Sequence, residues 1–293
     1  MVYSTRCPGK INLGLRILGE RNDGFHELDT IFCQCALADL LEFQPGFEEL
    51  TLIVDSQHDI GKPEQNLVIR ATREFANLTG IRITGTWNLH KNIPPAAGLG
   101  GGSIDAAAAL RILQEKYNAP IDREDLFKSA AHIGADVPFF LLGGMARGRG
   151  KGDRLERLAW PGSLYIILLI DTPGLSTADV YEQYRSGVRP DTENSIDLVA
   201  ALRGMMGGEC RIVDNDLSPA AYALRPELGN NMDILSQMEF TAVGLSGSGP
   251  TSYGITSSSD YARKSANQLR NLGYDVILTR YRPTVPRIVI HDS

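Results

Sequence analysis

Residues 94–103 read Pro94-Pro95-Ala96-Ala97-Gly98-Leu99-Gly100-Gly101-Gly102-Ser103, and the helix-forming run IDAAAALRILQEKY follows at once. The glycines allow backbone N–H groups to turn toward one point, and the next helix adds its unpaired first-turn donors and positive dipole end. Such a concave set of donors binds anions, most often phosphate. A flexible linker is the alternative, but linkers mix glycine with serine and seldom begin with Pro-Pro. We therefore predict a phosphate-binding loop over residues 94–104.

Two common nucleotide-binding loops do not fit this stretch. A Walker loop ends in Gly-Lys-Ser/Thr, and Gly102-Ser103-Ile104 has no lysine. A dinucleotide-binding loop has a third glycine where this chain has Ser103, and it lies in a strand–helix–strand unit. Residues 122–132, which follow the helix, predict a second helix. Both interpretations are therefore excluded.

The loop resembles the phosphate loop of the GHMP kinase superfamily (galactokinase, homoserine kinase, mevalonate kinase and phosphomevalonate kinase). Two further segments are similar to the other motifs of that superfamily: CPGKINL at residues 7–13 and GLSGSGPT at residues 244–251. Within it, RNDGFHEL at 21–28 and GADVPFF at 134–140 resemble the members that act on 4-diphosphocytidyl-2-C-methyl-D-erythritol. The order of these motifs is specific, and the resemblance spans nearly the whole chain.

Composition limits the class of protein. The 293 residues suit one or two domains, and a hydrophobic content of 43% is enough for two cores. The net charge of −6 shows no global attraction to nucleic acid. Cys7, Cys33, Cys35 and Cys210 form no Cys-x-x-Cys pair, which predicts free thiols in a reducing compartment. We see no signal sequence and no run of membrane-spanning length, so we expect a soluble, cytoplasmic protein without membrane or nucleic-acid partners.

The pattern of apolar residues predicts an α+β fold. Residues 6–18 alternate as a strand, with Lys10 and Asn12 on the polar side, and the turn at 21–24 leads into a second strand over 25–35. Further strands are expected at 39–44, 49–55, 81–90, 163–170, 240–246, 251–256 and 274–280, with a strand pair near 143–152. Helices are expected at 66–78, 103–117, 122–133, 176–185 and 260–272, and others between 194 and 238. The resemblance implies a ribosomal S5-like N-terminal domain, residues 1–158, and a ferredoxin-like C-terminal domain, residues 159–293.

The resemblance implies that Lys10 and Asp136 form the catalytic centre of an ATP-dependent kinase, with Mg²⁺ as cofactor. A nearby lysine would keep the carboxylate ionised and offset charge on the transferred phosphoryl group. From the residues alone, Asp136 reads as an ordinary helix N-cap and Lys10 as a solvated strand lysine. Asn12, on the same strand face, would hydrogen-bond the substrate or Asp136.

The resemblance also points to a pyrimidine site. His26 would hydrogen-bond the edge of the base, while Phe25 and Tyr181 would stack on it, with Tyr184 the rival to Tyr181 by helical spacing. The family usually has tyrosine at position 25, so any hydroxyl contact there is lost. From the residues alone, His26 reads as a partly buried structural histidine.

Other candidates surround the phosphate loop. Ser103 would donate its hydroxyl to a phosphate or to the magnesium shell, or act as an N-cap or first-turn residue. We expect Asp105 to serve the helix dipole, Asn66 and Lys91 to line the nucleotide pocket, and Trp87 to be either core or adenine wall. A valine at Gly101 is expected to disturb a positive φ angle.

The resemblance implies ATP-dependent phosphorylation of the 2-hydroxyl of 4-diphosphocytidyl-2-C-methyl-D-erythritol. A homoserine or mevalonate type of kinase would share the loop but would not need the pyrimidine site. A third alternative is a non-catalytic S5-like module that binds nucleic acid, which the net charge of −6 disfavours. The sequence leaves the metal ligands open, and it allows a monomer or a homodimer.

Overall fold

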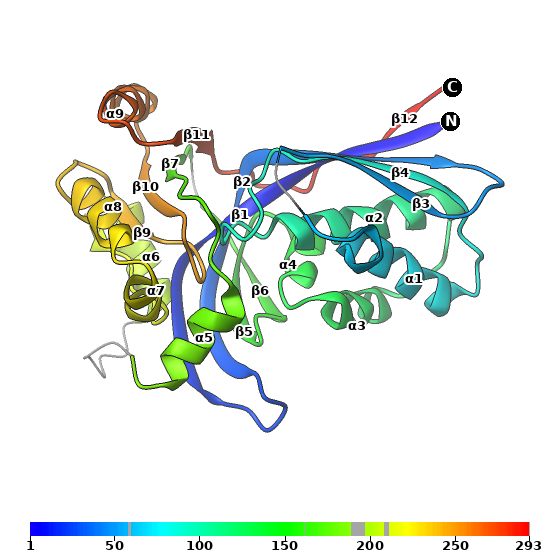
Figure 1. The fold of residues 1–293 in the computed structure, drawn as a ribbon, viewed down its shortest axis with the longest axis horizontal. Coiled ribbons are helices and arrows are strands. Elements are labelled where there is room, and N and C mark those ends of the chain that lie inside the picture. Colours follow the sequence, from blue (N-terminus) through cyan, green and yellow to red (C-terminus); the bar gives the residue numbers. More distant parts are fainter. Residues whose placement is uncertain (58–59, 161, 189–196, 208–210, 293) are drawn as a thin grey trace.

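Two β-sheets organise the molecule (Figure 1). The computed structural model describes residues 1–57, 60–160, 162–188, 197–207 and 211–292, so Cys210 lies outside the described residues. Within these ranges, one sheet has seven strands and the other has five. Cys7, Cys33 and Cys35 are buried free thiols. No helix in the described ranges is long and apolar enough to cross a membrane.

The first sheet is built on one long antiparallel hairpin. β1 (Val2–Glu20) and β2 (His26–Pro45) flank the predicted turn, and the order of strands along the sheet is β12-β1-β2-β4-β3. The sequence predicts two strands where β2 is continuous, because a register shift between Pro8 and Lys10 absorbs extra residues of β2 as a bulge. The remaining strands are β3 (Thr51–Asp55), β4 (Gly85–His90), β5 (Met145–Gly150), β6 (Arg154–Leu158) and β12 (Val289–His291).

Four helices lie along one side of this sheet: α1 (Leu67–Thr79), α2 (Gly101–Tyr117), α3 (Arg123–Ile133) and α4 (Val137–Leu142) (Figure 1). The predicted cap of α1 is confirmed, since the side chain of Asn66 accepts a hydrogen bond from Val68 N–H at 2.9 Å. In α2, residues Ala106 to Ala109 are all buried. Their small side chains let the phosphate-loop helix pack closely against its neighbours.

The second sheet has the predicted order of strand, helices, strand, strand, helix and strand, with one short strand, β8, among the helices that was not predicted. Its strands run in the order β11-β7-β10-β9-β8, and the α+β fold class is confirmed. The elements are β7 (Tyr165–Leu169), α5 (Thr177–Arg185), α6 (Leu198–Met206), β8 (Arg211–Ile212), α7 (Ser218–Leu224), α8 (Glu227–Ser236), β9 (Ala242–Leu245), β10 (Ser252–Thr256), α9 (Ser259–Asn271) and β11 (Val276–Arg280).

The two halves of the chain share a hydrophobic core. One cluster of buried residues joins Ile11 of the first sheet to Ile166 and Tyr253 of the second. The last strand, β12, returns to pair antiparallel with β1, so the two chain ends lie side by side (Figure 1). Apart from β12, the strands up to residue 158 belong to the first sheet and the later strands to the second. The division into domains 1–158 and 159–293 stays a prediction.

Candidate active site

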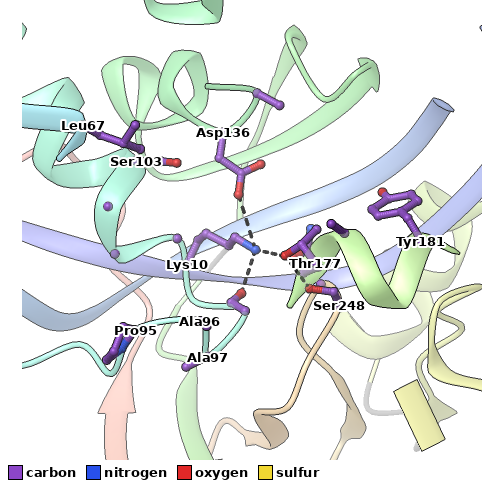
Figure 2. Close-up of a pocket in the computed structure, with 18 of the residues that line it drawn as sticks. Lys10, Leu67, Pro95, Ala96, Ala97, Ser103, Asp136, Thr177, Tyr181 and Ser248 are labelled. Carbon is purple, nitrogen blue, oxygen red and sulfur yellow. Dashed lines mark hydrogen bonds and ion pairs between the residues drawn. The ribbon is translucent and has the colours of Figure 1, made fainter. Parts of the chain in front are cut away.

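A pocket of about 760 Å³ opens between the glycine-rich loop, the β1–β2 hairpin and α5 (Figure 2). Every residue of the predicted phosphate loop lines it except Leu99 and Ile104, whose side chains are buried in the core. The other predicted site residues all line it as well: Lys10, Asn12, Phe25, His26, Asp136 and Tyr181. The fold therefore gathers residues from both halves of the chain around one cavity.

The loop presents the N-terminus of α2 to this pocket. Gly100 is the N-cap, with φ +72°, and the first helical hydrogen bond runs from Ile104 N–H to Gly100 C=O at 3.0 Å. The N–H groups of residues 101–103 therefore have no partner inside the helix. The helix begins two residues earlier than predicted, so Ser103 is a first-turn residue and the N-cap alternative is wrong. The expected positive φ at Gly101 is also wrong, because Gly98 and Gly100 are the loop glycines that adopt it.

The glycine segment at 244–251 braces the loop through a contact between Ser246 and Gly98. The carbonyl oxygen of Gly98 accepts hydrogen bonds from Lys10 Nζ at 2.8 Å and from Ser246 Oγ at 2.9 Å. A Cβ atom on Gly98 would lie 2.2 Å from the carbonyl oxygen of Ser246. Only glycine fits this close approach of two backbones.

Lys10 lies at the centre of the pocket with its side chain only 5% exposed. Its Nζ is 3.6 Å from Asp136 Oδ2 and donates to Asn12 Oδ1 at 2.7 Å (Figure 2). Burial lowers the pKa of Lys10, and the nearby Asp136 carboxylate opposes that shift. Asn12 donates its amide to Thr30 Oγ1 at 2.8 Å, so it contacts Lys10 and not Asp136 in this structure. Because the Lys10 side chain is buried, the alternative that Lys10 is a solvated strand lysine is wrong.

Asp136 stands at the N-cap position of α4, but its side chain makes no capping hydrogen bond. The carboxylate is 30% exposed and faces Lys10 and the pocket. Pro138 in the first turn has no N–H to be capped, and Val137 N–H donates to Gly134 C=O at 3.1 Å. The helix therefore begins without help from the Asp136 side chain, which is left available in the pocket.

The aromatic residues are arranged around His26. Tyr181 stacks on the His26 ring with 5.0 Å between ring centroids, while Tyr184 meets it edge-on at 6.0 Å. Tyr184 is 7% exposed and belongs to a core cluster, so Tyr181 is the tyrosine of α5 that lines the pocket. Phe25 is 53% exposed, and its ring lies 4.7 Å from Lys151 Nζ.

A buried ion cluster lies beneath the phosphate loop. Lys91 Nζ contacts Asp39 Oδ2 and lies 2.9 Å from Asp105 Oδ2, and all three side chains are almost fully buried. Burial raises the pKa of Asp105 to about 7, although Lys91 opposes the shift. The carboxylate of Asp105 is therefore the ion-pair partner of Lys91 in the first part of α2. The expectation that Asp105 serves the helix dipole did not include this ion pair.

The remaining candidates from the sequence have these outcomes, and two further pocket residues were not predicted. Asn66 and Lys91 line the pocket as expected. Trp87 is fully buried and donates to Thr72 Oγ1 at 3.0 Å, so it is a core residue. The sequence analysis missed Thr177 and Ser248, whose hydroxyls lie 2.9 Å apart in the pocket (Figure 2). Two signals in the sequence could have indicated them. Thr177 directly follows Ser176, the N-cap of α5, and Ser248 lies in the glycine segment at 244–251.

Comparison with known proteins agrees with this arrangement. The family model described as the GHMP kinases N terminal domain matches residues 66–144, and the model described as GHMP kinases C terminal matches residues 194–275. These ranges contain the phosphate loop, Asp136 and the glycine segment at 244–251.

Curated relatives match along almost the full chain. Proteins named 4-diphosphocytidyl-2-C-methyl-D-erythritol kinase from Pelotomaculum thermopropionicum and Bacillus cytotoxicus are 37% and 33% identical, each over 96% of this chain and 98% and 97% of their own. A crystal structure of 4-(cytidine 5'-diphospho)-2C-methyl-D-erythritol kinase is 35% identical with a TM-score of 0.80, covering 95% of this chain and 98% of that one. Homoserine kinase from Cytophaga hutchinsonii, at 19% identity and a TM-score of 0.72 over 98% and 97% of the two chains, shares the fold. With its phosphate loop, Lys10–Asp136 pair and two-sheet architecture, the chain belongs to the GHMP kinases, a family of ATP-dependent small-molecule kinases.

Proposed function

We propose that this kinase phosphorylates the 2-hydroxyl of 4-diphosphocytidyl-2-C-methyl-D-erythritol with ATP, in non-mevalonate isoprenoid synthesis. The observation that carries the proposal is a single pocket with three parts: the N-terminus of α2, the Lys10–Asp136 pair, and the His26–Tyr181 stack. The names of the curated relatives support the choice of the cytidylyl substrate.

The loop supplies binding and charge compensation for the phosphates. The backbone N–H groups of residues 101–103 and the positive end of α2 would hold the polyphosphate, with the Ser103 hydroxyl as an added donor. Lys10 would offset charge on the transferred phosphoryl group. Its ammonium is held in place by hydrogen bonds to the Asn12 side-chain oxygen and to the Gly98 carbonyl oxygen. Fixed donors of this kind need no rearrangement as charge moves.

Asp136 would orient the acceptor hydroxyl and accept its proton. Phosphoryl-transfer transition states are loose, so little proton transfer is needed before the phosphoryl group moves. Its carboxylate is exposed enough to reach a ligand and lies 3.6 Å from the Lys10 ammonium. The pair thus combines positioning with electrostatic stabilisation.

Mg²⁺ fits this site as an ion that arrives with ATP. Among the described residues, no group of three or more His, Cys, Asp and Glu side chains could form a metal cage. Mg²⁺ commonly uses one carboxylate together with phosphate oxygens and water. Ser103 would add its hydroxyl to the shell of that ion, since Asp105 is paired with Lys91 and Asp136 faces Lys10. The ion would neutralise charge on the β- and γ-phosphates.

The other end of the pocket suits a pyrimidine. Phe25 and Tyr181 offer flat apolar surfaces and His26 offers ring nitrogens at its edge. A base bound there would place the rest of a cytidylyl substrate along the pocket toward Lys10 and Asp136. The proposal includes a cytoplasmic protein that acts as a monomer or a homodimer and binds no nucleic acid, which the net charge of −6 supports.

The test is release of ADP by the purified protein with three alcohols offered separately: the cytidylyl substrate, homoserine and mevalonate. We expect Mg²⁺-dependent turnover with the first alone, and product phosphorylated at the 2-hydroxyl. Turnover of homoserine or mevalonate with none of the cytidylyl substrate would contradict the proposal. RNA binding that weakens with salt, without kinase turnover, would support the nucleic-acid alternative.

A further inference from the structure

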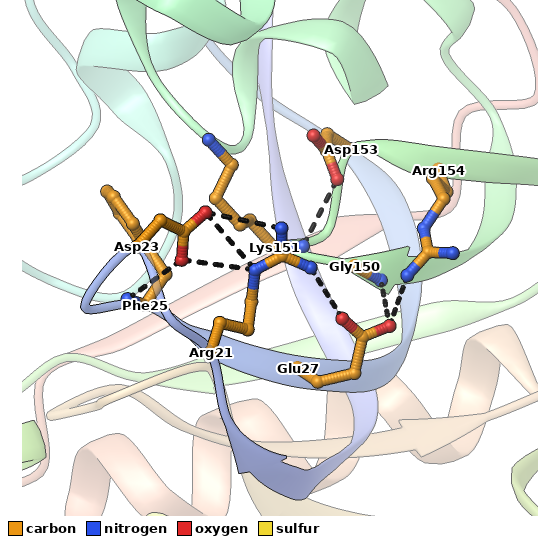
Figure 3. A network of polar contacts seen from close by, with 8 residues as sticks. All are labelled: Arg21, Asp23, Phe25, Glu27, Gly150, Lys151, Asp153 and Arg154. Atoms are coloured by element: carbon orange, nitrogen blue, oxygen red, sulfur yellow. Dashed lines mark hydrogen bonds and ion pairs between the residues drawn. The ribbon is translucent and has the colours of Figure 1, made fainter.

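Phe25 is an exposed aromatic residue on a tight turn, and such a side chain needs support to act as a fixed wall. The turn that carries it is held by its own contacts. Arg21 N–H donates to the carbonyl oxygen of Phe25 at 2.8 Å, and Phe25 N–H donates to Asp23 Oδ1 at 3.2 Å. The guanidinium of Arg21 also contacts the Asp23 carboxylate, with Nε 3.2 Å from Oδ1 (Figure 3). The backbone on both sides of Phe25 is therefore fixed.

Glu27 connects this turn to a second one. Its Oε2 accepts from Arg21 Nη1 at 2.6 Å, while its Oε1 accepts from Gly150 N–H at 3.2 Å and from the Arg154 guanidinium (Figure 3). Arg21 lowers the pKa of Glu27, in keeping with a carboxylate that is used as an acceptor on both oxygens. The β1–β2 and β5–β6 turns are thus joined through one side chain.

Lys151 is the residue of the β5–β6 turn that lines the pocket. It follows Gly150 directly, its N–H donates to Asp153 Oδ1 at 3.1 Å, and its Nζ lies 4.7 Å from the centre of the Phe25 ring. A cation this close to an aromatic face is attracted to it. Phe25 and Lys151 both line the pocket, so Glu27 sets the distance between two pocket residues without lining the pocket itself.

We propose that Glu27 is a positioning residue for the cytidylyl end of the substrate, acting through Phe25 and Lys151; this inference rests on the proposed function. A site that is ordered before binding loses less conformational entropy when the ligand arrives. Ion pairs that water still reaches contribute little to global stability, and the Glu27 side chain is 30% exposed. The effect of Glu27 therefore falls on substrate affinity and not on the stability of the fold.

The test compares steady-state kinetics of the wild type, Glu27→Gln and Glu27→Ala with both substrates varied. We expect KM for the cytidylyl substrate to rise roughly 2- to 12-fold, as for one side chain that must be ordered on binding. The kcat, the KM for ATP and Tm should stay unchanged. Glu20→Gln is the matched control: Glu20 is an exposed carboxylate on the same hairpin, and in the described part of the chain its side chain makes no hydrogen bond or ion pair.

A double-variant comparison separates positioning from a direct role. In a Phe25→Ala, Lys151→Ala background, Glu27→Gln should raise KM no further, because the residues through which it acts are gone. A wild-type protein that turns over the cytidylyl substrate while the Glu27 variants keep its KM overturns this inference alone. An equal rise in both KM values, or a lowered Tm, also overturns it. A wild-type protein inactive on that substrate overturns the proposed function and the inference together.

Discussion

Tyr181 lies stacked on His26, with 5.0 Å between the ring centroids and 28° between the ring planes. Burial raises the pKa of Tyr181, so its phenol stays neutral at any physiological pH. One face of each ring is occupied by the other. A cytosine held between Phe25 and Tyr181 would therefore use the face of Tyr181 that is turned away from His26, or would displace the tyrosine ring.

The first prediction concerns this stack. Tyr181→Ala is expected to raise the KM for the cytidylyl substrate by about 5- to 150-fold, because stacking contributes ~1–3 kcal/mol per base. The KM for ATP should change little. Tyr181→Phe keeps the ring and should be nearly silent. Comparable KM values for Tyr181→Ala and the wild type would show that the base binds elsewhere.

The second prediction concerns the Lys10–Asp136 pair. Asp136→Asn and Lys10→Ala are each expected to lower kcat by about 10²- to 10⁴-fold, because both groups act on the reacting centre. Asp136→Asn should keep its Tm, since the carboxylate caps no helix. Kinetics and thermal unfolding of the same preparations measure both effects. Near-normal turnover in both variants would mean that the reacting centre lies elsewhere.

The third prediction concerns the phosphate loop. Gly101→Val is expected to weaken ATP binding at least about tenfold, ~1.4 kcal/mol, and to leave the cytidylyl substrate nearly unaffected. A Cβ atom there would lie 3.1 Å from Lys91 Nζ and 3.2 Å from a methyl of Ile93, beside the backbone donors. Titration of each ligand separately checks the difference.

Two alanine variants serve as controls for that loop. Gly102→Ala should bind ATP normally, because the nearest atom to its Cβ would be Leu67 Cδ1 at 3.5 Å. Gly98→Ala should lower Tm sharply, since a left-handed conformation costs about 1–2 kcal/mol in a non-glycine residue and the Cβ would meet the Ser246 carbonyl. A Gly101→Val protein that loses both ligands equally would indicate misfolding instead.

The fourth prediction concerns pH and Asp105. Its folded pKa of about 7 exceeds the ordinary value of 3.8, so the folded state holds the proton more tightly than the unfolded state does. Stability linked to this carboxyl is therefore present at acid pH and is lost as pH rises toward and through 7. Asp105→Asn, which mimics the neutral form, should raise Tm relative to the wild type, and by more at pH 8 than at pH 5.

The control for that experiment is Asp125→Asn, an exposed carboxylate on α3. It should show the same Tm difference at both pH values. A wild-type protein whose Tm exceeds that of Asp105→Asn most strongly at pH 8 would mean that the ion pair with Lys91 outweighs the cost of burying the charge.

The sequence predicts those parts of the site that depend on local geometry. Glycines directly before a helix favour a turn that leaves the first-turn N–H groups open to an anion, and alternation along residues 6–18 places Lys10 and Asn12 on one side of a strand. The structure confirms that Lys10 lies beside Asp136. The catalytic and substrate-binding roles of these residues stay predictions.

The sequence does not predict the contacts that join distant segments. Asp39 lies on β2, Lys91 directly after β4 and Asp105 on α2, and nothing local at any of them indicates a partner. The same holds for Glu27 with Arg154. The strand β12 is three residues long with exposed side chains, so it has no alternation to detect, and only its pairing with β1 defines it.

That pairing has a consequence for biosynthesis. Because β12 is an edge strand of the first sheet, the segment that forms the second sheet is inserted between two parts of the first. Because a ribosome makes β1 long before β12, the first sheet stays one strand short until residues 289–291 emerge. Until then the free edge of β1 is open to other extended chains, and pairing with β12 closes it.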